Sequence, residues 1–320
     1  MNMEYRALGN CGLKVSKLSF GGWATFGETV KDQQTVSEIL RHAYESGVNF
    51  FDMADIYGGG ESERMMGKVL GEFPRHRLVL TSKVFWPASE DVNDCGLSRK
   101  HIMESIEKSL KRIGVDYLDI YYCHRFDEHT PLEETIRAMD DLVHQGKILY
   151  WGSSEWNAQQ LTEAHAIANF RNLYRPQVEQ PMYNLLVRKK VETTILPLAK
   201  KTGMGVVSYS PLASGFLTGK YDQGIPDESR FSRMEFLRDW FYNQHNIQKL
   251  NRFKKIAAEV GCSRAQLALA WTAAQPGISS VLTGATRVDQ IKDNLKAAEI
   301  EINAELNQEL NELFPVDPTS

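Results

Sequence analysis

Four polar residues in the first half of the sequence have the types needed for proton transfer: Asp52, Tyr57, Lys83 and His124. A free phenol has a pKa of about 10, too high for ready proton exchange at neutral pH. A neighbouring ammonium lowers this pKa, and a carboxylate paired with the ammonium would keep it charged and oriented. We therefore expect Lys83 and Asp52 to tune Tyr57 as a general acid/base. His124 could donate a hydrogen bond to a carbonyl oxygen beside it, and a cofactor would have to supply any hydride.

The positions of these residues are more informative than their types. Taken singly, a strand-end aspartate commonly caps the next helix, a lone lysine is commonly solvated, and a single histidine is more often structural than catalytic. Asp52, Lys83 and His124, however, close three successive β-rich segments, and Tyr57 follows Asp52 by five residues, just before three glycines. If these segments are neighbouring parallel strands, their side chains meet at one rim.

Short β-rich segments and helical patterns alternate along the chain. The eight predicted strands span 18–20, 48–51, 78–83, 117–123, 149–152, 177–180, 206–209 and 280–282. The predicted helices span 34–46, 98–113, 131–145, 157–170, 189–202, 247–260, 264–274 and 288–297, with a last helix over 305–314. Asp32, Ser98 and Thr130 are expected to cap the first three helices. A hairpin over 5–8 and 13–15 precedes the first unit.

Eight strand-then-helix units with short connections predict parallel pairing and a (β/α)₈ (TIM) barrel. The alternative, an open doubly wound sheet, would usually carry a G-x-G-x-x-G sequence after its first strand, and Phe20-Gly21-Gly22-Trp23 does not match it. No linker-like segment divides the chain. We expect one domain over residues 1–320, with an N-terminal β-hairpin and an extra C-terminal helix.

The composition is typical of a folded globular protein. The 320 residues are 42% hydrophobic and 24% charged, with a net charge of −4, which excludes a disordered chain and argues against nucleic-acid binding. No apolar run of 18 residues occurs, so no membrane insertion is expected. The four cysteines form no C-x-x-C pair, so no metal site is expected, and the cytoplasm is the predicted location.

Several motifs together resemble the aldo-keto reductase family. Phe51-Asp52-Met53-Ala54-Asp55-Ile56-Tyr57-Gly58, Thr81-Ser82-Lys83 and His124 are similar to the family's Asp/Tyr/Lys/His tetrad. The resemblance continues through 150–156, 178–180, 208–215 and 284–294, and covers roughly residues 3–315. Within the family, the segment 219–226 is similar to the branch that includes the voltage-gated potassium channel β subunits.

The resemblance implies an enzyme that reduces aldehydes and ketones with NADPH. Tyr57 would donate the proton, and the positions matching substrate contacts are Trp23, Tyr57, Trp86 and His124. Positions matching the cofactor-binding residues are Gly22, Trp23, Asp52, Ser154, Gln180, Tyr209, Ser210, Leu212, Ser214, Lys220, Arg230, Gly284, Thr286, Arg287, Gln290, Asp293 and Asn294.

By the same resemblance, these positions divide among the parts of NADPH. Ser154 and Gln180 would hold the nicotinamide carboxamide, and Tyr209 would stack on the ring. The pyrophosphate would lie along Ser210, Leu212, Ser214 and Lys220. The 2′-phosphate and adenosine would meet Arg230, Thr286, Arg287, Gln290, Asp293 and Asn294.

Two departures from the family pattern bear on function. Glu155 stands where the family commonly has asparagine, and a carboxylate cannot donate to a carboxamide oxygen, so Glu155 is not predicted as a site residue. The channel β subunits carry asparagine at the position of His124, which favours an ordinary reductase here. The alternative is an NADPH-binding regulatory subunit with slow turnover.

Other interpretations stay open at this stage. Without the family, 210–213 could be only a turn, Lys220 and Arg230 could be solvated, and the tryptophans could be core residues. The segment 230–243 is expected to form a loop or short helix over the cofactor. The channel-like branch suggests a homo-oligomer, with a tetramer favoured.

Overall fold

Eight parallel strands close into a barrel in the computed structural model, which describes residues 3–316. Around the barrel the order is β10-β3-β4-β5-β6-β7-β8-β9, so strands that are consecutive in sequence are neighbours in space. The strands are β3 Leu18–Gly21, β4 Phe50–Asp52, β5 Val79–Val84, β6 Leu118–Cys123, β7 Ile148–Ser154, β8 Val178–Gln180, β9 Gly205–Ser208 and β10 Ile278–Thr283. The predicted (β/α)₈ barrel and its eight strands are confirmed.

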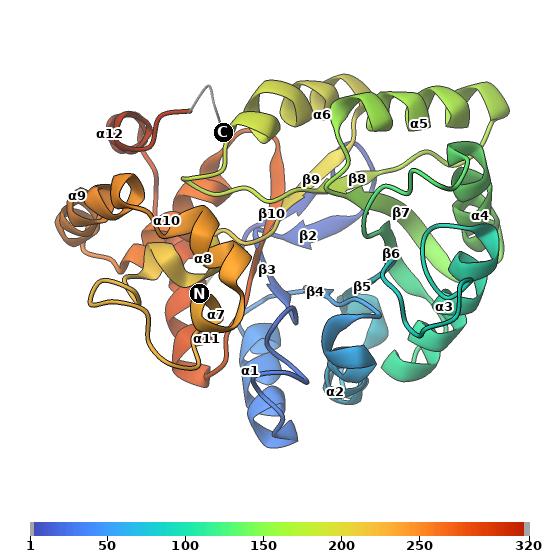
Figure 1. The fold of residues 1–320 in the computed structure, drawn as a ribbon, viewed down its shortest axis with the longest axis horizontal. Coiled ribbons are helices and arrows are strands. Elements are labelled where there is room, and N and C mark those ends of the chain that lie inside the picture. Colours follow the sequence, from blue (N-terminus) through green and yellow to red (C-terminus); the bar gives the residue numbers. More distant parts are fainter. Residues whose placement is uncertain (1–2, 317–320) are drawn as a thin grey trace.

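Helices surround the strands on the outside of the barrel (Figure 1). They are α1 Gln33–Glu45, α2 Glu61–Leu70, α3 Arg99–Ile113, α4 Leu132–His144, α5 Ala158–Arg171, α6 Leu196–Thr202, α7 Arg230–Arg233, α8 Glu235–Phe241, α9 Gln244–Val260, α10 Arg264–Ala274, α11 Val288–Leu295 and α12 Ala304–Leu313. Among residues 3–316, no helix combines the length and the apolar character that a membrane span requires.

An antiparallel hairpin of β1 Tyr5–Ala7 and β2 Lys14–Ser16 lies at the amino-terminal end of the barrel, as predicted. Its residues Leu8 and Val15 are fully buried and pack with the side chains inside the barrel. The strand residues of that inner cluster are Phe50, Val79, Ile120, Tyr122, Val178, Val207 and Leu282. The hairpin therefore closes this end of the barrel and leaves the opposite, carboxyl-terminal rim for a site.

The structure corrects the predicted helices in several places. Helix α2 was not predicted, and Thr130 does not cap α4: the N-cap is Pro131, and the Thr130 hydroxyl instead donates to Asp127 Oδ2 at 2.8 Å. Asp32 and Ser98 do cap α1 and α3. The predicted helix over 189–202 begins as a π-helical segment, Val191–Ile195, before α6. The segment 230–243 contains the two short helices α7 and α8.

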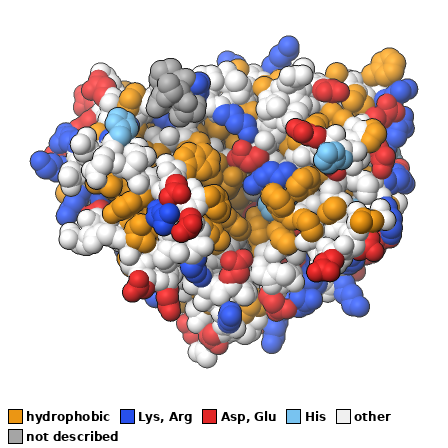
Figure 2. Space-filling view, in the orientation of Figure 1, with side chains coloured by type: hydrophobic (Ala, Val, Ile, Leu, Met, Phe, Trp, Pro, Cys, Tyr) orange, Lys and Arg blue, Asp and Glu red, His pale blue; other side chains and the backbone are white. Residues whose placement is uncertain are grey.

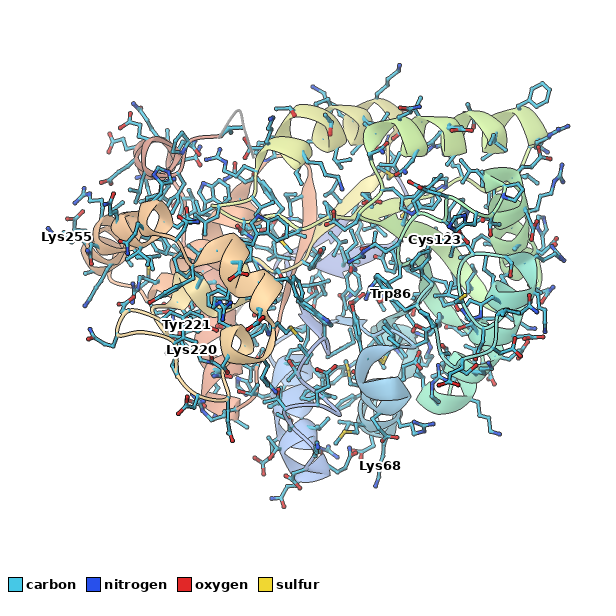
Figure 3. All side chains as sticks on the ribbon, viewed as in Figure 1. Lys68, Trp86, Cys123, Lys220, Tyr221 and Lys255 are labelled. Atoms are coloured by element: carbon cyan, nitrogen blue, oxygen red, sulfur yellow. The ribbon has the colours of Figure 1, made fainter. Side chains whose placement is uncertain are left out.

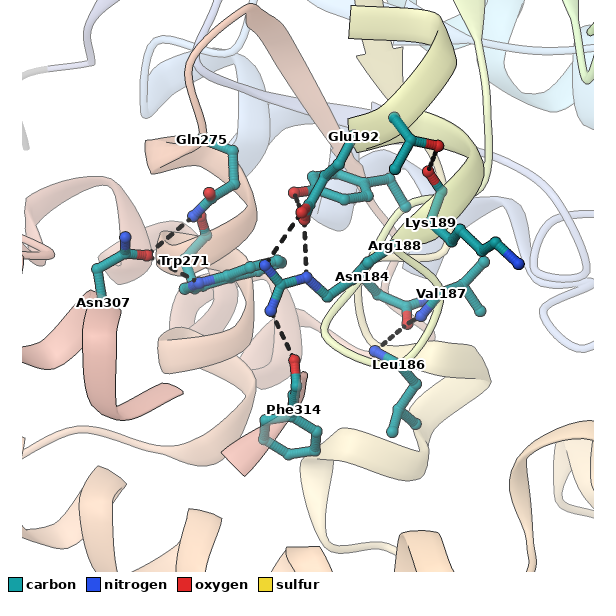
Figure 4. A network of polar contacts seen from close by, with 12 residues as sticks. Asn184, Leu186, Val187, Arg188, Lys189, Glu192, Trp271, Gln275, Asn307 and Phe314 are labelled. Carbon is teal, nitrogen blue, oxygen red and sulfur yellow. Dashed lines mark hydrogen bonds and ion pairs between the residues drawn. The ribbon is translucent and has the colours of Figure 1, made fainter. Parts of the chain in front are cut away.

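A buried polar network joins the last helix to the barrel (Figure 4). The Arg188 guanidinium pairs with Glu192 at 2.7 Å and donates from Nη1 to the backbone carbonyl of Phe314 at 2.6 Å. It also lies 4.8 Å from the ring centroid of Trp271, whose indole N–H donates to Asn307 at 3.1 Å. The network thereby connects the segment after β8 with α10 and α12.

Candidate active site

The four predicted proton-transfer residues converge at the carboxyl-terminal rim of the barrel. The strand register places Asp52 of β4 beside Thr81 of β5, and Lys83 of β5 beside Tyr122 of β6. The Lys83 ammonium forms an ion pair with Asp52 and donates to the Met53 carbonyl at 2.8 Å. It also lies 4.8 Å from the ring centroid of Tyr57.

Asp52 is held by two further donors. The Thr81 hydroxyl and the Gln180 side-chain amide both donate to its Oδ1, at 2.8 Å and 3.0 Å. With Lys83 on the other oxygen, both oxygens of the buried carboxylate are satisfied, which fixes the orientation of the ion pair. Lys83 is fully buried and Asp52 is 2% exposed.

The predicted direction of the Tyr57 pKa is wrong for this structure. Burial raises the pKa of the Tyr57 phenol well above its ordinary value, the Asp52 charge raises it further, and the charge of Arg125 opposes the shift. Burial is the largest of these effects, so it decides the direction of the shift. The phenol is therefore protonated at neutral pH, as a proton donor must be.

The imidazole of His124 lies next to the phenol. The rings of Tyr57 and His124 are 5.7 Å apart between centroids, at 78°, and the ring of Trp86 lies 6.3 Å from that of His124. Burial lowers the pKa of His124 well below its ordinary value, and the charges of Lys83 and Arg125 add to this effect. The imidazole is therefore neutral at neutral pH and can donate a single ring proton to a carbonyl oxygen.

A cavity of about 1190 Å³ opens at this rim. Figure 2 shows a hollow on this face with hydrophobic side chains gathered around it, and Figure 3 shows Trp86 on one side of the barrel mouth and Lys220 on the other. The predicted site residues that line the cavity are Trp23, Asp52, Tyr57, Trp86, His124, Ser154, Gln180, Tyr209, Ser210, Leu212, Ser214, Lys220, Arg230, Gly284, Thr286, Arg287, Gln290, Asp293 and Asn294.

Two predicted site residues do not reach the cavity wall. Lys83 lies behind Asp52, and Gly22 packs against α2, where a Cβ would come within 2.3 Å of the Ser62 hydroxyl and 2.9 Å of the Met66 sulfur. Glycine at position 22 is explained by this close packing, while its neighbours Gly21 and Trp23 face the cavity.

The loop after β9 is shaped to receive an anion. Ser210, Ala213 and Ser214 have φ values of 51°, 47° and 58°, in the left-handed region that costs non-glycine residues about 1–2 kcal/mol each. Backbone in such conformations turns N–H groups toward one concave side. The hydroxyls of Ser210 and Ser214 are buried without a hydrogen-bond partner among residues 3–316. Two unsatisfied hydroxyls on the wall of a large cavity fit a ligand with acceptor oxygens.

Basic side chains gather at the same end of the cavity. The pKa of Lys220 is lowered by partial burial and by the charges of Arg230, Arg233 and Arg287. In the described part of the chain, Lys220, Arg230 and Arg233 form no ion pair with a carboxylate, whereas Arg287 pairs with Asp289. The cluster therefore carries uncompensated positive charge, which suits the phosphates of a dinucleotide.

Several of the remaining predicted cofactor residues form hydrogen bonds within the protein. Gln290 Oε1 accepts from the backbone and the hydroxyl of Thr286, at 2.7 Å and 3.0 Å. Both carboxylate oxygens of Asp293 accept hydrogen bonds, from Ser263 and Gln266. Asn294 donates to Thr283 at 2.9 Å. These contacts hold the start of α10 and the loop before α11 around the cavity end.

Glu155, at the position where the family commonly has asparagine, forms two polar interactions within the protein. Its carboxylate accepts from the backbone N–H of Met182 at 2.6 Å and pairs with Lys190 at 2.8 Å. Both interactions lie within the protein and hold the segment after β8 against the segment after β7.

The cavity-lining residues that the sequence analysis did not predict include Arg125, Met182 and Arg233. The available signal for Arg125 was its place directly after a strand-end histidine. Arg233 follows Arg230 by one helical turn on α7, so the two share a face. Met182 carried no comparable signal.

A closed parallel barrel with a buried Asp–Lys pair, a tyrosine and a histidine at its carboxyl-terminal rim defines an aldo/keto reductase. The model of the aldo/keto reductase family matches residues 17–314, and the chain belongs to that family.

Curated relatives cover nearly all of the chain. It is 48% identical to a probable voltage-gated potassium channel subunit beta of Arabidopsis thaliana and 47% identical to one of Oryza sativa subsp. japonica, in both cases over 93% of this chain and 92% of the relative. A putative voltage-gated potassium channel subunit beta of Schizosaccharomyces pombe is 40% identical over 99% of this chain and 95% of the relative. The predicted resemblance to this branch is confirmed.

Proposed function

We propose that this protein reduces aldehydes or ketones to alcohols with NADPH. The observation that carries the proposal is the contact between a protonated buried phenol and a neutral imidazole on the wall of one cavity, Tyr57 and His124, with the Lys83–Asp52 pair behind them. A phenol and an imidazole N–H together can position a carbonyl oxygen and protonate it.

The other end of the same cavity suits the dinucleotide. Ser210, Ser214 and Lys220 would hold the pyrophosphate, because two free hydroxyls and an ammonium meet there. Bound NADPH would supply the hydride. The ring of Tyr209 lies 6.4 Å from that of Trp23, in an edge-to-face arrangement, and would stack on the nicotinamide ring. Ser154 and Gln180 would hold the nicotinamide carboxamide.

The 2′-phosphate that distinguishes NADPH from NADH would meet the basic cluster. The Arg230 guanidinium lies 5.2 Å from the ring centroid of Trp23, which is itself a predicted substrate contact. Arg233 and Arg287 are therefore further candidates for the 2′-phosphate beside Arg230.

The role of each catalytic side chain follows from its surroundings. Tyr57 would donate its proton to the carbonyl oxygen, and His124 would orient that oxygen by a hydrogen bond. Lys83 would stabilise the phenolate that remains, since an adjacent ammonium favours the ionised phenol. Asp52 keeps Lys83 charged and in place.

The experiment that tests this function compares the parent with Tyr57→Phe, using a simple aromatic aldehyde and the loss of NADPH absorbance. Loss of the general acid should lower kcat by about 10²–10⁴-fold. The dissociation constant for NADPH, measured by fluorescence, should stay within about threefold, because the hydroxyl serves the chemical step.

Tyr174→Phe is the matched control, since Tyr174 is exposed and outside the cavity. It should keep the parent rate. A Tyr57→Phe variant that reduces the aldehyde at the parent rate would remove Tyr57 from the mechanism.

A second candidate function is that of an NADPH-binding regulatory subunit, favoured by the relatives' being named as channel subunits. It would bind NADPH tightly, turn over very slowly and join a membrane protein. The complete Asp/Tyr/Lys/His set favours the reductase. Steady-state rates with aldehydes, ketones and quinones separate the two. The same branch motivates the proposal of a homotetramer, which light scattering in solution can test.

A further inference from the structure

Arg125 is a charged residue on the cavity wall that the proposed reduction does not use. It follows His124 directly in sequence and is half-buried. Its Nη1 atom donates to the backbone carbonyl of His124 and lies 3.4 Å from the hydroxyl of Ser154. Within residues 3–316, its Nε and Nη2 atoms form no hydrogen bond, and no carboxylate pairs with it. Because a guanidinium stays charged in proteins, the cavity contains a cation with free donors.

The surroundings of this cation are apolar and close to the catalytic groups. The guanidinium carbon lies 5.8 Å from the ring centroid of Trp86, and that ring lies 6.3 Å from the ring of His124. The charge of Arg125 acts on the reacting groups, because it lowers the pKa of His124 and opposes the rise in the pKa of Tyr57.

Few other charges compete at this end of the cavity. The carboxylate of Asp52 is paired with Lys83. Of the basic cluster, Arg230 lies over the ring of Trp23, whereas Arg125 lies over the ring of Trp86 beside His124. An anionic group on a substrate would therefore meet Arg125 in a setting of low dielectric, where a charge-assisted hydrogen bond is strong.

We propose that Arg125 binds a carboxylate on the substrate, so that the preferred substrates are carbonyl compounds with a carboxylate separated from the carbonyl by an apolar spacer. This inference rests on the proposed carbonyl reduction. The free donors of the guanidinium match the two oxygens of a carboxylate, and the Trp86 ring provides an apolar surface for the spacer.

A matched pair of aldehydes tests the inference: 4-carboxybenzaldehyde and its neutral methyl ester. The parent should have the higher kcat/KM for the acid. In Arg125→Met, kcat/KM for the acid should fall by about tenfold to a hundredfold, mainly through KM, because one hydrogen-bonded charge contact is lost. The ester should change by less than about threefold. Arg125→Lys keeps the charge without the planar guanidinium, so its kcat/KM for the acid should lie between those of the parent and Arg125→Met.

Arg77→Met provides the control, because it removes the same side chain from an exposed position just before β5, at the opposite end of the barrel. It should leave both substrates unaffected. An equal loss for acid and ester in Arg125→Met, or a parent that prefers the ester, would overturn the inference and assign Arg125 to holding the loop after β6.

A binding measurement separates this inference from the proposed function. The ligand is 4-(hydroxymethyl)benzoate, the alcohol formed from the acid substrate, and its binding is measured by calorimetry in the presence of NADP⁺. Arg125→Met should bind it about tenfold more weakly or worse than the parent, because the same hydrogen-bonded charge contact is lost. If the protein binds this acid through Arg125 but reduces no carbonyl, the proposed function fails and the subsite stands. If both aldehydes are reduced and affinity for the acid is independent of Arg125, the subsite fails alone.

Discussion

Tyr57 is buried almost completely, and burial acts unequally on the two ionisation states of its phenol. The neutral form loses little on leaving water, whereas the phenolate loses its hydration. Lys83 compensates only in part, because its own charge is shared with Asp52. In the proposed reaction, this balance would keep the phenol protonated until a carbonyl oxygen accepts the proton, and the adjacent ammonium would then stabilise the phenolate.

Asp55 is a second buried acid, located behind Tyr57. Its Oδ2 accepts from Ser105 at 3.0 Å, and its Oδ1 is buried without a partner among the described residues. Burial, together with the nearby charge of Glu63, raises the pKa of Asp55 to about 7. Glu63 itself pairs with Arg112.

We expect this raised pKa to make stability fall as the pH rises. Between the ordinary pKa of an aspartate and about 7, the folded protein holds a proton on Asp55 that the unfolded chain has lost. Folding is therefore weakened by up to about 1.4 kcal/mol for each pH unit in that window. Asp55→Asn removes this titration. Urea unfolding at about pH 5 and pH 8 should show the variant gaining stability relative to the parent at the higher pH; a constant difference would contradict the assignment.

Most of the site was predictable because each residue has a local mark: Asp52, Lys83 and His124 end β-rich segments, and a barrel brings such ends together. The direction of the Tyr57 pKa was not predictable, because it depends on depth of burial, which no short segment encodes. Arg125 and Arg233 were missed for a related reason. A surface arginine and an arginine on a cavity wall have the same sequence appearance.

At the scale of elements, the strands were easier to predict than the helix starts. Helix α2 begins after Gly60, without a side-chain cap, so the usual mark of a helix start is missing. Its Gly67 would also weaken the pattern, since glycine disfavours helix interiors. The structure explains that glycine: a Cβ there would lie 2.2 Å from the Ile113 carbonyl of α3, so the two helices pack too closely for a side chain.

The buried network around Arg188 predicts a large effect of one substitution. Arg188→Met would leave the Glu192 carboxylate with only the Tyr183 hydroxyl and the Phe314 carbonyl without its donor, and should lower the free energy of unfolding by about 2–4 kcal/mol. Arg137→Met, which breaks an exposed i,i+4 pair with Glu133, should cost less than about 1 kcal/mol. Denaturant unfolding of both variants measures the difference; equal small losses would show that the network does not hold α12 to the barrel.

At the scale of the whole molecule, the closed barrel leads us to propose that residues 1–320 form one cooperative domain. Every strand of the barrel pairs with two neighbours, so no barrel strand can leave without breaking the ring. Thermal unfolding followed by circular dichroism and by tryptophan fluorescence should show one coincident transition.

NADPH should move this transition upward as a unit, by the equivalent of about 2.7 kcal/mol at one hundred times its dissociation constant. NADH should shift it less at the same concentration, because it lacks the phosphate that the basic cluster around Lys220 and Arg233 would meet. Two separate transitions would contradict the single domain, and equal shifts by both dinucleotides would contradict the phosphate assignment.

The hairpin near the start of the chain also constrains the order in which the protein is assembled. Arg6 donates to the carbonyls of Ala273 and Ile278, 267 and 272 positions further along, and Leu8 and Val15 cover the inner faces of strands from all round the ring. During synthesis, the hairpin cannot form its contacts with the completed barrel until β10 has been made. Loop closure over such a span is slow. We therefore expect a nascent chain halted before β10 to expose apolar strand residues that the complete barrel covers.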